Sequence, residues 1–279
     1  MNKFIIIFII LFSFFNISYT NGFSKDNVLL KTNNSYIITD NDKILIDNFI
    51  NKLLNFSLEK NINLEFLINR IEKKIWSRVL PIRIKTIIDS IIEWLNQKVC
   101  NDYYKIHKNI IASVFWVWEE SNSSNAFISN KSSAWDEDWL VHSKNENKYY
   151  FALPYNDFDE DWNRKNNSKK IPWYFLKKWN NNESIIKNRW IKFESNWKIA
   201  YAQWEDVWPL GEDDFEYVFW DKKSKNTFWL KAWIDLSPDL ADYLNIDWEW
   251  KVDWNFVPEY CVVDKKFKEK ITKSNIYWK

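Results

Sequence analysis

Residues 201–210 read YAQWEDVWPL and residues 232–238 read AWIDLSP, and these two stretches decide the fold of the second half of the chain. In the first, a strand-like run enters two adjacent acids and then a proline, which is typical of a strand that ends in a sharp turn. In the second, Ser237 is a natural helix N-cap and Pro238 a natural first helical residue. Together they predict a strand, a turn and, about thirty residues later, a short helix.

Short strand patterns separated by turns continue from about residue 110 onward. The candidate strands are residues 111–117, 149–153, 190–193, 198–203, 215–219 and 252–257. The polar stretch 119–148 reads as a loop, and residues 237–244 read as a helix. Many strands with one or two short helices predict a small β-barrel over residues 106–279.

Residues 21–105 have a different pattern, because their apolar residues recur at helical spacing. Three such stretches lie at about 46–54, 64–75 and 84–95, and Asn63 is a candidate N-cap for the second. They predict a helical hairpin or small bundle, so the expected fold class is α+β. This region shows no chemistry of its own; it is either a structural spacer or a surface for a partner.

The first twenty residues have the pattern of a secretory signal peptide. A short basic start is followed by the apolar run Phe4–Phe15 and by small residues before a cleavage point near Thr20-Asn21. The run is shorter than the roughly 20 residues that span a bilayer, although an uncleaved anchor is the alternative. We therefore expect a secreted or cell-surface protein, with no membrane span once the signal is removed.

Only two cysteines occur, Cys100 and Cys261. In an oxidising compartment they could form one disulfide that ties together the two ends of the barrel domain. Two unpaired buried thiols are the alternative.

The composition excludes several classes of protein. The 39 Lys and Arg balance the 38 Asp and Glu, so no basic excess points to nucleic acid. The chain has only 2 Gly but 20 Trp. Two glycines exclude a glycine-loop nucleotide binder, and they are too few for the turns of a globular chain, because positions with positive φ favour Gly.

We interpret this imbalance between Gly and Trp as the result of a misread codon. Some lineages read UGA as Gly and others as Trp, so translation by the wrong table turns glycines into tryptophans. Dipeptides such as Asn196-Trp197 and Asp161-Trp162 would then be Asn-Gly and Asp-Gly, which are tight-turn signals. The positions expected to be glycine are Trp118, Trp162, Trp179, Trp197, Trp208, Trp220, Trp229, Trp233, Trp248 and Trp250. Those expected to be true tryptophans are Trp173, Trp190, Trp204 and Trp254. The alternative is a Trp-rich carbohydrate binder.

With glycine at position 208, residues 205–209 read Glu-Asp-x-Gly-Pro, and the Ile-Asp-Leu-Ser segment at 234–237 follows. This pair resembles the double-psi β-barrel family of glycan-active proteins. That family includes rare-lipoprotein-A-type lytic transglycosylases, expansins and the family 45 and family 75 glycoside hydrolases, the last being chitosanases. The resemblance covers residues 190–257, about a quarter of the chain. As written, Trp208 and Trp233 depart from the family's glycines.

The resemblance implies carbohydrate chemistry at a six-stranded double-psi barrel. Asp206 matches the family's acidic residue at the turn, the candidate general acid, and Asp235 matches the position of a second acid in chitosanase-like members. A two-carboxylate hydrolase uses one acid to protonate the leaving oxygen and the other to activate water. A lytic transglycosylase needs only the acid. The alternatives are an Asp206 that caps the turn and an Asp235 that caps the helix.

Further residues are candidates for contacting the sugar or for catalysis. The candidate substrate-binding residues are Glu205, Tyr201, Trp204, Asp157 and Trp173. For the three aromatic residues among them, core packing is the alternative role. The reserve acids are Glu212, Asp213 and Asp214.

The acidic run 157–162 becomes D-x-D-x-D-G when position 162 is glycine, which resembles the opening of a calcium loop. Position 168 is Ser and not the closing Glu, so a solvated acidic turn is the favoured interpretation. The two histidines, His107 and His142, lack cysteines at zinc spacing. We therefore expect no metal and no cofactor.

The sequence thus predicts a secreted polysaccharide-cleaving enzyme, either a chitosanase-like glycoside hydrolase or a peptidoglycan lytic enzyme, with Asp206 as general acid. Its partner would be a chitosan-like polymer or peptidoglycan. The alternative is a non-hydrolytic, expansin-like module that binds carbohydrate in cell walls.

Overall fold

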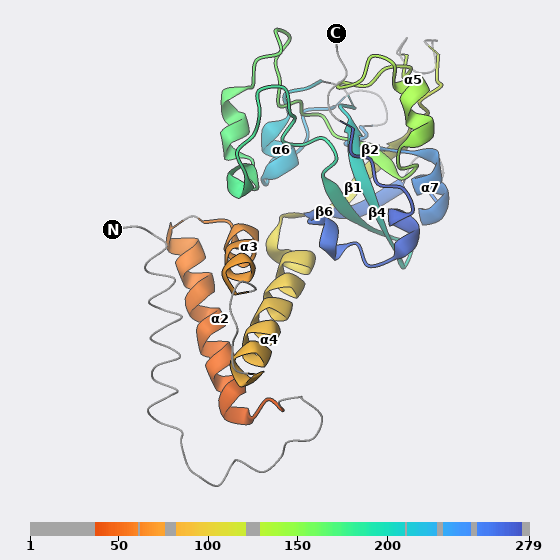
Figure 1. Ribbon diagram of the computed structural model, residues 1–279. Coiled ribbons are helices and arrows are strands. Elements are labelled where there is room, and N and C mark those ends of the chain that lie inside the picture. Colours follow the sequence, from red (N-terminus) through yellow and green to blue (C-terminus); the bar gives the residue numbers. More distant parts are fainter. Residues whose placement is uncertain are drawn as a thin grey trace, which may run out of the picture. The chain divides into compact units, whose positions relative to one another are not determined.

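The computed structural model describes residues 37–60, 62–75, 82–120, 129–209, 211–227, 231–246 and 250–274. The expected signal peptide, residues 1–20, lies outside these ranges. The chain divides into two compact units, Met1–Leu95 and Asn96–Lys279 (Figure 1). Within the described residues, no helix combines the length and the apolar character needed to cross a membrane.

Three helices, α2 (Asp40–Lys60), α3 (Leu64–Ile75) and α4 (Ile82–Lys98), form at the expected helical stretches. Thr39 and Asp42 cap α2 reciprocally, since each backbone N–H donates to the other side chain, at 3.0 and 3.2 Å. Asn63 caps α3 as expected, because its Oδ1 accepts from the Phe66 N–H at 3.1 Å. The apolar residues that set the helical spacing are buried; they include Phe49, Ile50, Leu53, Leu67, Ile68, Ile71, Ile88, Ile91 and Leu95.

The second unit is built on six strands that close into a barrel. They are β1 (Ile106–Val114), β2 (Tyr150–Ala152), β3 (Trp190–Ser195), β4 (Lys198–Asp206), β5 (Ile234–Leu236) and β6 (Trp250–Val257). The order around the barrel is β1-β5-β2-β4-β3-β6, with β1/β5 and β2/β4 parallel and the other pairs antiparallel. The α+β class and the six-stranded barrel are therefore confirmed.

The barrel has a topological two-fold symmetry. Advancing each strand by three positions, so that β1 becomes β4, β2 becomes β5 and β3 becomes β6, reproduces the same set of neighbours and the same strand directions. The parallel pair β1/β5 exchanges with the parallel pair β2/β4 under this operation. The two halves of the chain therefore form equivalent frameworks, which the sequence equips differently.

Aromatic rings fill the barrel core. Phe151 of β2 packs against Phe193 of β3 and Trp204 of β4, with ring centroids 5.8 and 5.9 Å apart. Trp204 stacks on Phe256 of β6 at 5.8 Å. All four side chains are at most 2% exposed, so this cluster joins four of the six strands.

The assignment of one strand from the sequence was wrong. Residues 215–219, expected to be a strand, form the helix α6 (Phe215–Phe219), and the sixth strand is β5 instead. Four of the five residues of α6 are buried, so its nearly continuous apolar character follows from burial on several sides and could not distinguish helix from strand. The expected loop 119–148 also contains a short helix, α5 (Trp139–His142).

The helix after β5 forms as predicted. In α7 (Pro238–Leu244) the Ser237 side chain accepts from the Leu240 N–H, and Pro238 occupies the first turn. Asn245 ends the helix in the left-handed conformation with φ 56°.

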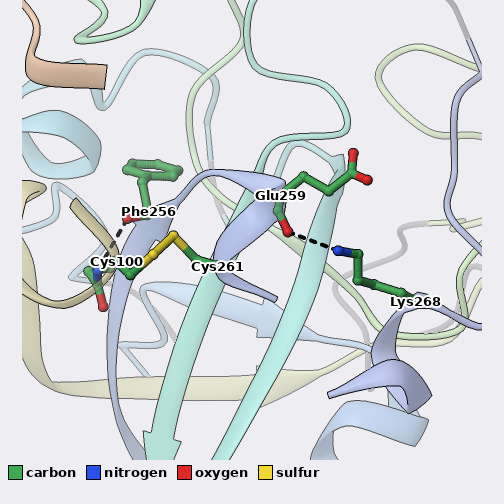
Figure 2. The surroundings of a disulfide bond; sticks show 6 residues. Cys100, Phe256, Glu259, Cys261 and Lys268 are labelled. Atoms are coloured by element: carbon green, nitrogen blue, oxygen red, sulfur yellow. Dashed lines mark hydrogen bonds between the residues drawn. A yellow bond between two sulfur atoms is a disulfide. The ribbon is translucent and has the colours of Figure 1, made fainter. Parts of the chain in front are cut away.

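Cys100 and Cys261 form a disulfide, with their Cα atoms 5.4 Å apart (Figure 2). Cys100 lies in the turn of π-helix that follows α4, and Cys261 lies in a short 3-10 helix after β6. Beside it, the Lys268 Nζ donates to the Glu259 carbonyl at 3.2 Å. The bond therefore joins the entry of the barrel unit to the segment after its last strand, as the disulfide alternative predicted.

The tryptophans fall into two groups by burial. The buried group contains Trp135, Trp139, Trp173, Trp190, Trp204 and Trp254, none more than 3% exposed. All four positions expected to be true tryptophans belong to it. Of those expected to be glycine, Trp118, Trp162, Trp197 and Trp220 are exposed and Trp179, Trp208 and Trp233 are partly exposed. Trp229, Trp248 and the side chain of Trp250 lie outside the described part of the structure.

Two of the exposed tryptophans have backbone conformations that favour glycine. Trp162 has φ 58° and Trp197 has φ 61°, in the left-handed region that bulky side chains rarely adopt. Asn196, with φ 48°, precedes Trp197 in the two-residue turn between β3 and β4. Two consecutive left-handed residues define a type I′ hairpin, for which Asn-Gly is the preferred sequence.

Candidate functional site

Two buried carboxylates lie on one row across the barrel. Asp206 ends β4 and pairs with Ala152 of β2, which pairs in turn with Asp235 of β5. Asp235 is also the register partner of Ser113 of β1. Ser113, Asp235 and Ala152 pair in regular register and project to one face. Asp206 joins the end of this row across an irregularity in the register between β2 and β4.

Asp206 is held at the edge of this row by backbone donors. Its Oδ1 accepts from the Ala134 N–H at 2.7 Å, and the residue is 8% exposed. Burial raises the pKa of Asp206 to about 7, because the charged form is desolvated. The hydrogen bonds from the Ala134 and Val207 N–H groups oppose this rise, and the negative charge of Asp235 adds to it.

Asp235 has a similar environment and a different partner. It is 3% exposed, and its Oδ1 accepts a hydrogen bond from the Ser113 hydroxyl. Burial raises the pKa of Asp235 to about 7, against the lowering effect of the Ser113 hydrogen bond. Two buried carboxyl groups with raised pKa values, one of them raised further by the charge of the other, are an arrangement in which one can hold a proton while the other is ionised.

The strand spacing sets the distance between the backbones of the two acids. Asp206 and Asp235 are two strands apart, which at about 4.8 Å per strand places their backbones roughly 10 Å apart. Between the two acids, Ala152 contributes only a methyl group.

A mainly apolar wall lies beside the row. Ala152 packs with Phe115, Val117 and Trp139, and the partly buried Trp208 packs against the same cluster. The Trp208 N–H also donates to the Leu153 carbonyl at 3.2 Å, which fixes the turn after Asp206. This wall buries Ala152, the residue that lies between the two acids in the strand order.

The expected substrate-binding aromatics lie in the core and not on an open surface. Trp204 is fully buried, and its Nε1 donates to the Asp206 carbonyl at 2.7 Å. Trp173 is 1% exposed and donates to the Ile185 carbonyl at 2.8 Å. Tyr201 is 9% exposed and packs edge-on against Phe267. None of these placements offers a sugar an open ring face; Trp204 instead supports the backbone of Asp206.

The two other expected substrate contacts are also engaged internally. The Glu205 carboxylate, 1% exposed, forms a buried ion pair with Lys187 at 2.9 Å, and burial raises the pKa of Glu205 to about 7. Asp157 is fully buried and accepts from Arg164 at 3.0 Å and from Ser184 Oγ and the Ile185 N–H at 2.7 Å. Both residues organise the protein interior beside the row.

The acidic run 157–162 uses its carboxylates to build a turn. Asp157 faces inward, as described, and Asp159 Oδ1 accepts from the N–H groups of Asp161 and Asn163 at 3.1 and 2.8 Å. Throughout the described residues, no three His, Cys, Asp or Glu side chains gather in a way that could hold a metal ion. The observed role of the run is the turn.

Sequence reasoning did not identify two partners of the site. Ser113 and the Ala134 N–H contact the two acids from segments 122 and 72 residues away, so no local motif reveals them. The segment that carries Ala134 also holds the buried Asp136, which bonds His142 Nδ1 at 2.7 Å. In the sequence, only the clustering of Trp, Asp and His between residues 135 and 142 indicated the contact between Asp136 and His142.

No family model matches the chain, and no curated protein matches it. Among solved structures, the chain resembles the Streptomyces papain inhibitor (SPI) at 12% identity over 55% of this chain and 96% of that chain, with a TM-score of 0.25. At that score the likeness carries no argument about function.

Proposed function

We propose that this protein is an extracytoplasmic glycan-cleaving enzyme of the double-psi barrel type, with Asp206 as general acid. The observation that carries the proposal is the strand pairing that brings Asp206 and Asp235 to the two sides of Ala152, where burial raises the pKa of each to about 7. A general acid is most effective when its pKa lies near the working pH. Asp235, two strands away, is the candidate second carboxylate.

The roles follow from the motifs that carry the two acids. Asp206 ends β4 in the Glu-Asp-x-Gly-Pro motif, whose acid is the candidate proton donor, and Asp235 is the candidate base that activates water. Both carboxylates accept hydrogen bonds that stabilise the ionised form, Asp235 from the Ser113 hydroxyl and Asp206 from the Ala134 N–H. We therefore assign the donated proton to Asp206 on its motif and its place at the strand end.

The disulfide supports an extracytoplasmic location, because such bonds persist in oxidising compartments. It agrees with the signal peptide expected from residues 1–20. Detection of the mature N-terminus near residue 21 in the culture medium or on the cell surface tests this part of the proposal.

The activity is tested with peptidoglycan sacculi and with chitosan, by measuring new reducing ends and anhydro-sugar products. We expect Asp206→Asn to abolish release without unfolding the protein, and Asp235→Asn to abolish hydrolysis specifically. Asp239→Asn, on the exposed side of α7, is the matched control and should keep full activity. Wild-type rates in Asp206→Asn would refute the assignment.

One observation favours a second function, a non-hydrolytic carbohydrate-binding module. Both acids are nearly inaccessible, at 8% and 3% exposure, which suits a structural role. This alternative predicts binding to insoluble polymer with no new reducing ends, and binding that is indifferent to Asp206→Asn.

A further inference from the structure

Positive charge is concentrated in one segment of the barrel unit. Residues 265–273 read KKFKEKITK, so five lysines stand against a single acid, Glu269. The segment therefore carries a formal charge of +4, although the chain as a whole carries only +1. This local excess creates a positive surface potential that the balanced composition of the chain does not reveal.

Two anchors hold the segment on the barrel. The buried Phe267 ring packs edge-on against Tyr149 and Tyr243, with ring centroids 4.8 and 5.2 Å apart. The side-chain amide of Gln203 binds the backbone of the buried Thr272 at both ends. The Thr272 N–H donates to Gln203 Oε1 at 2.8 Å, and Gln203 Nε2 donates to the Thr272 carbonyl at 3.0 Å. The lysines beside these anchors are therefore displayed on a fixed backbone.

The lysines of the segment point to solvent or to uncharged groups. Three of them are exposed, namely Lys265, Lys270 and Lys273. The Lys268 Nζ donates to the Glu259 carbonyl at 3.2 Å (Figure 2). The Lys270 Nζ donates to the Lys144 carbonyl at 3.1 Å. Among the described residues, no carboxylate forms an ion pair with any of the five, so their positive charge is not neutralised.

A sixth lysine, Lys198 of β4, extends this surface. Its ammonium lies 5.4 Å from the centre of the Tyr243 ring, and the Lys266 ammonium lies 3.5 Å from the same centre. The two ammonium groups are therefore within about 9 Å of each other. Lys198 Nζ donates only to uncharged groups, the Tyr243 carbonyl at 2.7 Å and Asn245 Oδ1 at 2.8 Å. Two like charges held this close repel each other, and an anion placed between them is attracted to both.

We propose that this basic patch, formed by Lys198 and the five lysines of residues 265–273, binds an anionic polysaccharide with a negative charge on each repeating unit. A polymer can meet several of these lysines at once, whereas a single small anion cannot. The patch contains Lys and no Arg, so it supplies point charges and not the planar forks that select one carboxylate. Point charges on a fixed support suit a partner whose anions recur along a chain.

The construction of the patch favours a polysaccharide over a membrane or a nucleic acid. The two apolar residues of the segment, Phe267 and Ile271, are buried and partly buried, so they are not presented for insertion into a bilayer. The Tyr243 ring already has the Lys266 ammonium over it, which leaves less ring surface for stacking of a base. The extracytoplasmic location proposed above agrees with a glycan partner.

The partner class is tested by calorimetry on the full chain with three probes. Polygalacturonate is the anionic polysaccharide, dextran is the neutral one, and phosphatidylglycerol vesicles are the anionic membrane. We expect binding to polygalacturonate at about 0.1 M salt, where charges act over about 10 Å, and its loss at about 1 M, where they act over about 3 Å. Binding to dextran, or tighter binding to vesicles than to polygalacturonate at equal anionic charge, would overturn the proposal.

Two triple variants locate the binding surface. Replacement of Lys265, Lys270 and Lys273 by Gln should weaken binding to polygalacturonate roughly tenfold, which is the combined effect expected of three exposed charge contacts. The matched control replaces three exposed lysines outside the patch by Gln, namely Lys169, Lys170 and Lys223. The control loses the same net charge and should keep its affinity within about twofold. An equal loss in both triples, or no loss in the first, would contradict the assignment to the patch.

The patch acts independently of the proposed cleavage, because Asp206 is buried and makes no contact with the basic segment among its hydrogen bonds. Asp206→Asn should therefore bind polygalacturonate as tightly as the native protein. Loss of binding in that variant, with an unchanged circular dichroism spectrum, would place the polymer at the carboxylates and overturn the proposal.

Discussion

The turn between β3 and β4 gives the sharpest test of the glycine interpretation. Trp197 is fully exposed and has φ 61°, so its ring makes no buried contact that a substitution would lose. The left-handed conformation costs an L-residue roughly 1–2 kcal/mol, whereas glycine adopts it freely. Glycine in turn loses about 0.5–1 kcal/mol through the greater freedom of the unfolded chain. We therefore expect Trp197→Gly to stabilise the barrel unit by about 0.5–1 kcal/mol.

The assay is urea denaturation followed by circular dichroism, with Trp197→Ala as the matched control. Alanine removes the ring but keeps the Cβ that causes the strain, so it should give little or none of the gain. Trp254→Gly provides the opposite case, because that ring is 1% exposed and its loss should cost about 3–5 kcal/mol. The reasoning fails if Trp197→Gly is no more stable than Trp197→Ala.

Three further predictions concern pH and the disulfide. Burial raises the pKa of Asp206 from 3.8 to about 7, so the stability that its protonated form contributes is complete below pH 4 and is lost as the pH rises through 7. Asp206→Asn should therefore be more stable than the native protein at pH 8, by up to about 4 kcal/mol, and equally stable at pH 4. Burial lowers the pKa of His107 to about 3, so the free energy of unfolding of the native protein should fall by up to about 5 kcal/mol between pH 6.5 and pH 3. The variant His107→Phe, which keeps the stacking on Trp254, should remove that part of the pH dependence in denaturation curves. Reduction of the Cys100–Cys261 bond, which spans 161 residues, should lower the free energy of unfolding by roughly 2–5 kcal/mol, and an unchanged denaturation midpoint in reductant would contradict this.

Local signals were enough to predict the elements whose residues interact with near neighbours. The N-caps at Asn63 and Ser237 and the hairpin turn at 196–197 each depend on contacts within a few residues, and each is found where it was expected. Helix α6 failed because a short apolar run has no usable period when it is buried on several sides. Strand β5 was missed because three residues are too few for alternation to show.

In the candidate site, too, local motifs could be predicted from the sequence and long-range contacts could not. Asp206 and Asp235 were identified by their local motifs, and the barrel brings them to one row. Their partners Ser113 and Ala134 were out of reach, because strand pairing across 122 and 72 residues creates those contacts. For Trp204, a candidate sugar contact with core packing as the alternative, the sequence could not choose, because it does not show that β4 is enclosed along almost its whole length.

The two-fold topology explains why an acid pair can arise on this framework. The symmetry axis passes between β5 and β2, so it relates Asp206 to Ser113 and Asp235 to Ala152. Each half of the barrel thus supplies one outer and one inner position of the row. Both carboxylates lie in the second half, Asp206 at the outer position and Asp235 at the inner one. A carboxylate at all four would bury like charges side by side, which low dielectric makes prohibitive. With a hydroxyl and a methyl group at the other two positions, the row holds two acids that share a raised pKa and can still be buried in a folded protein.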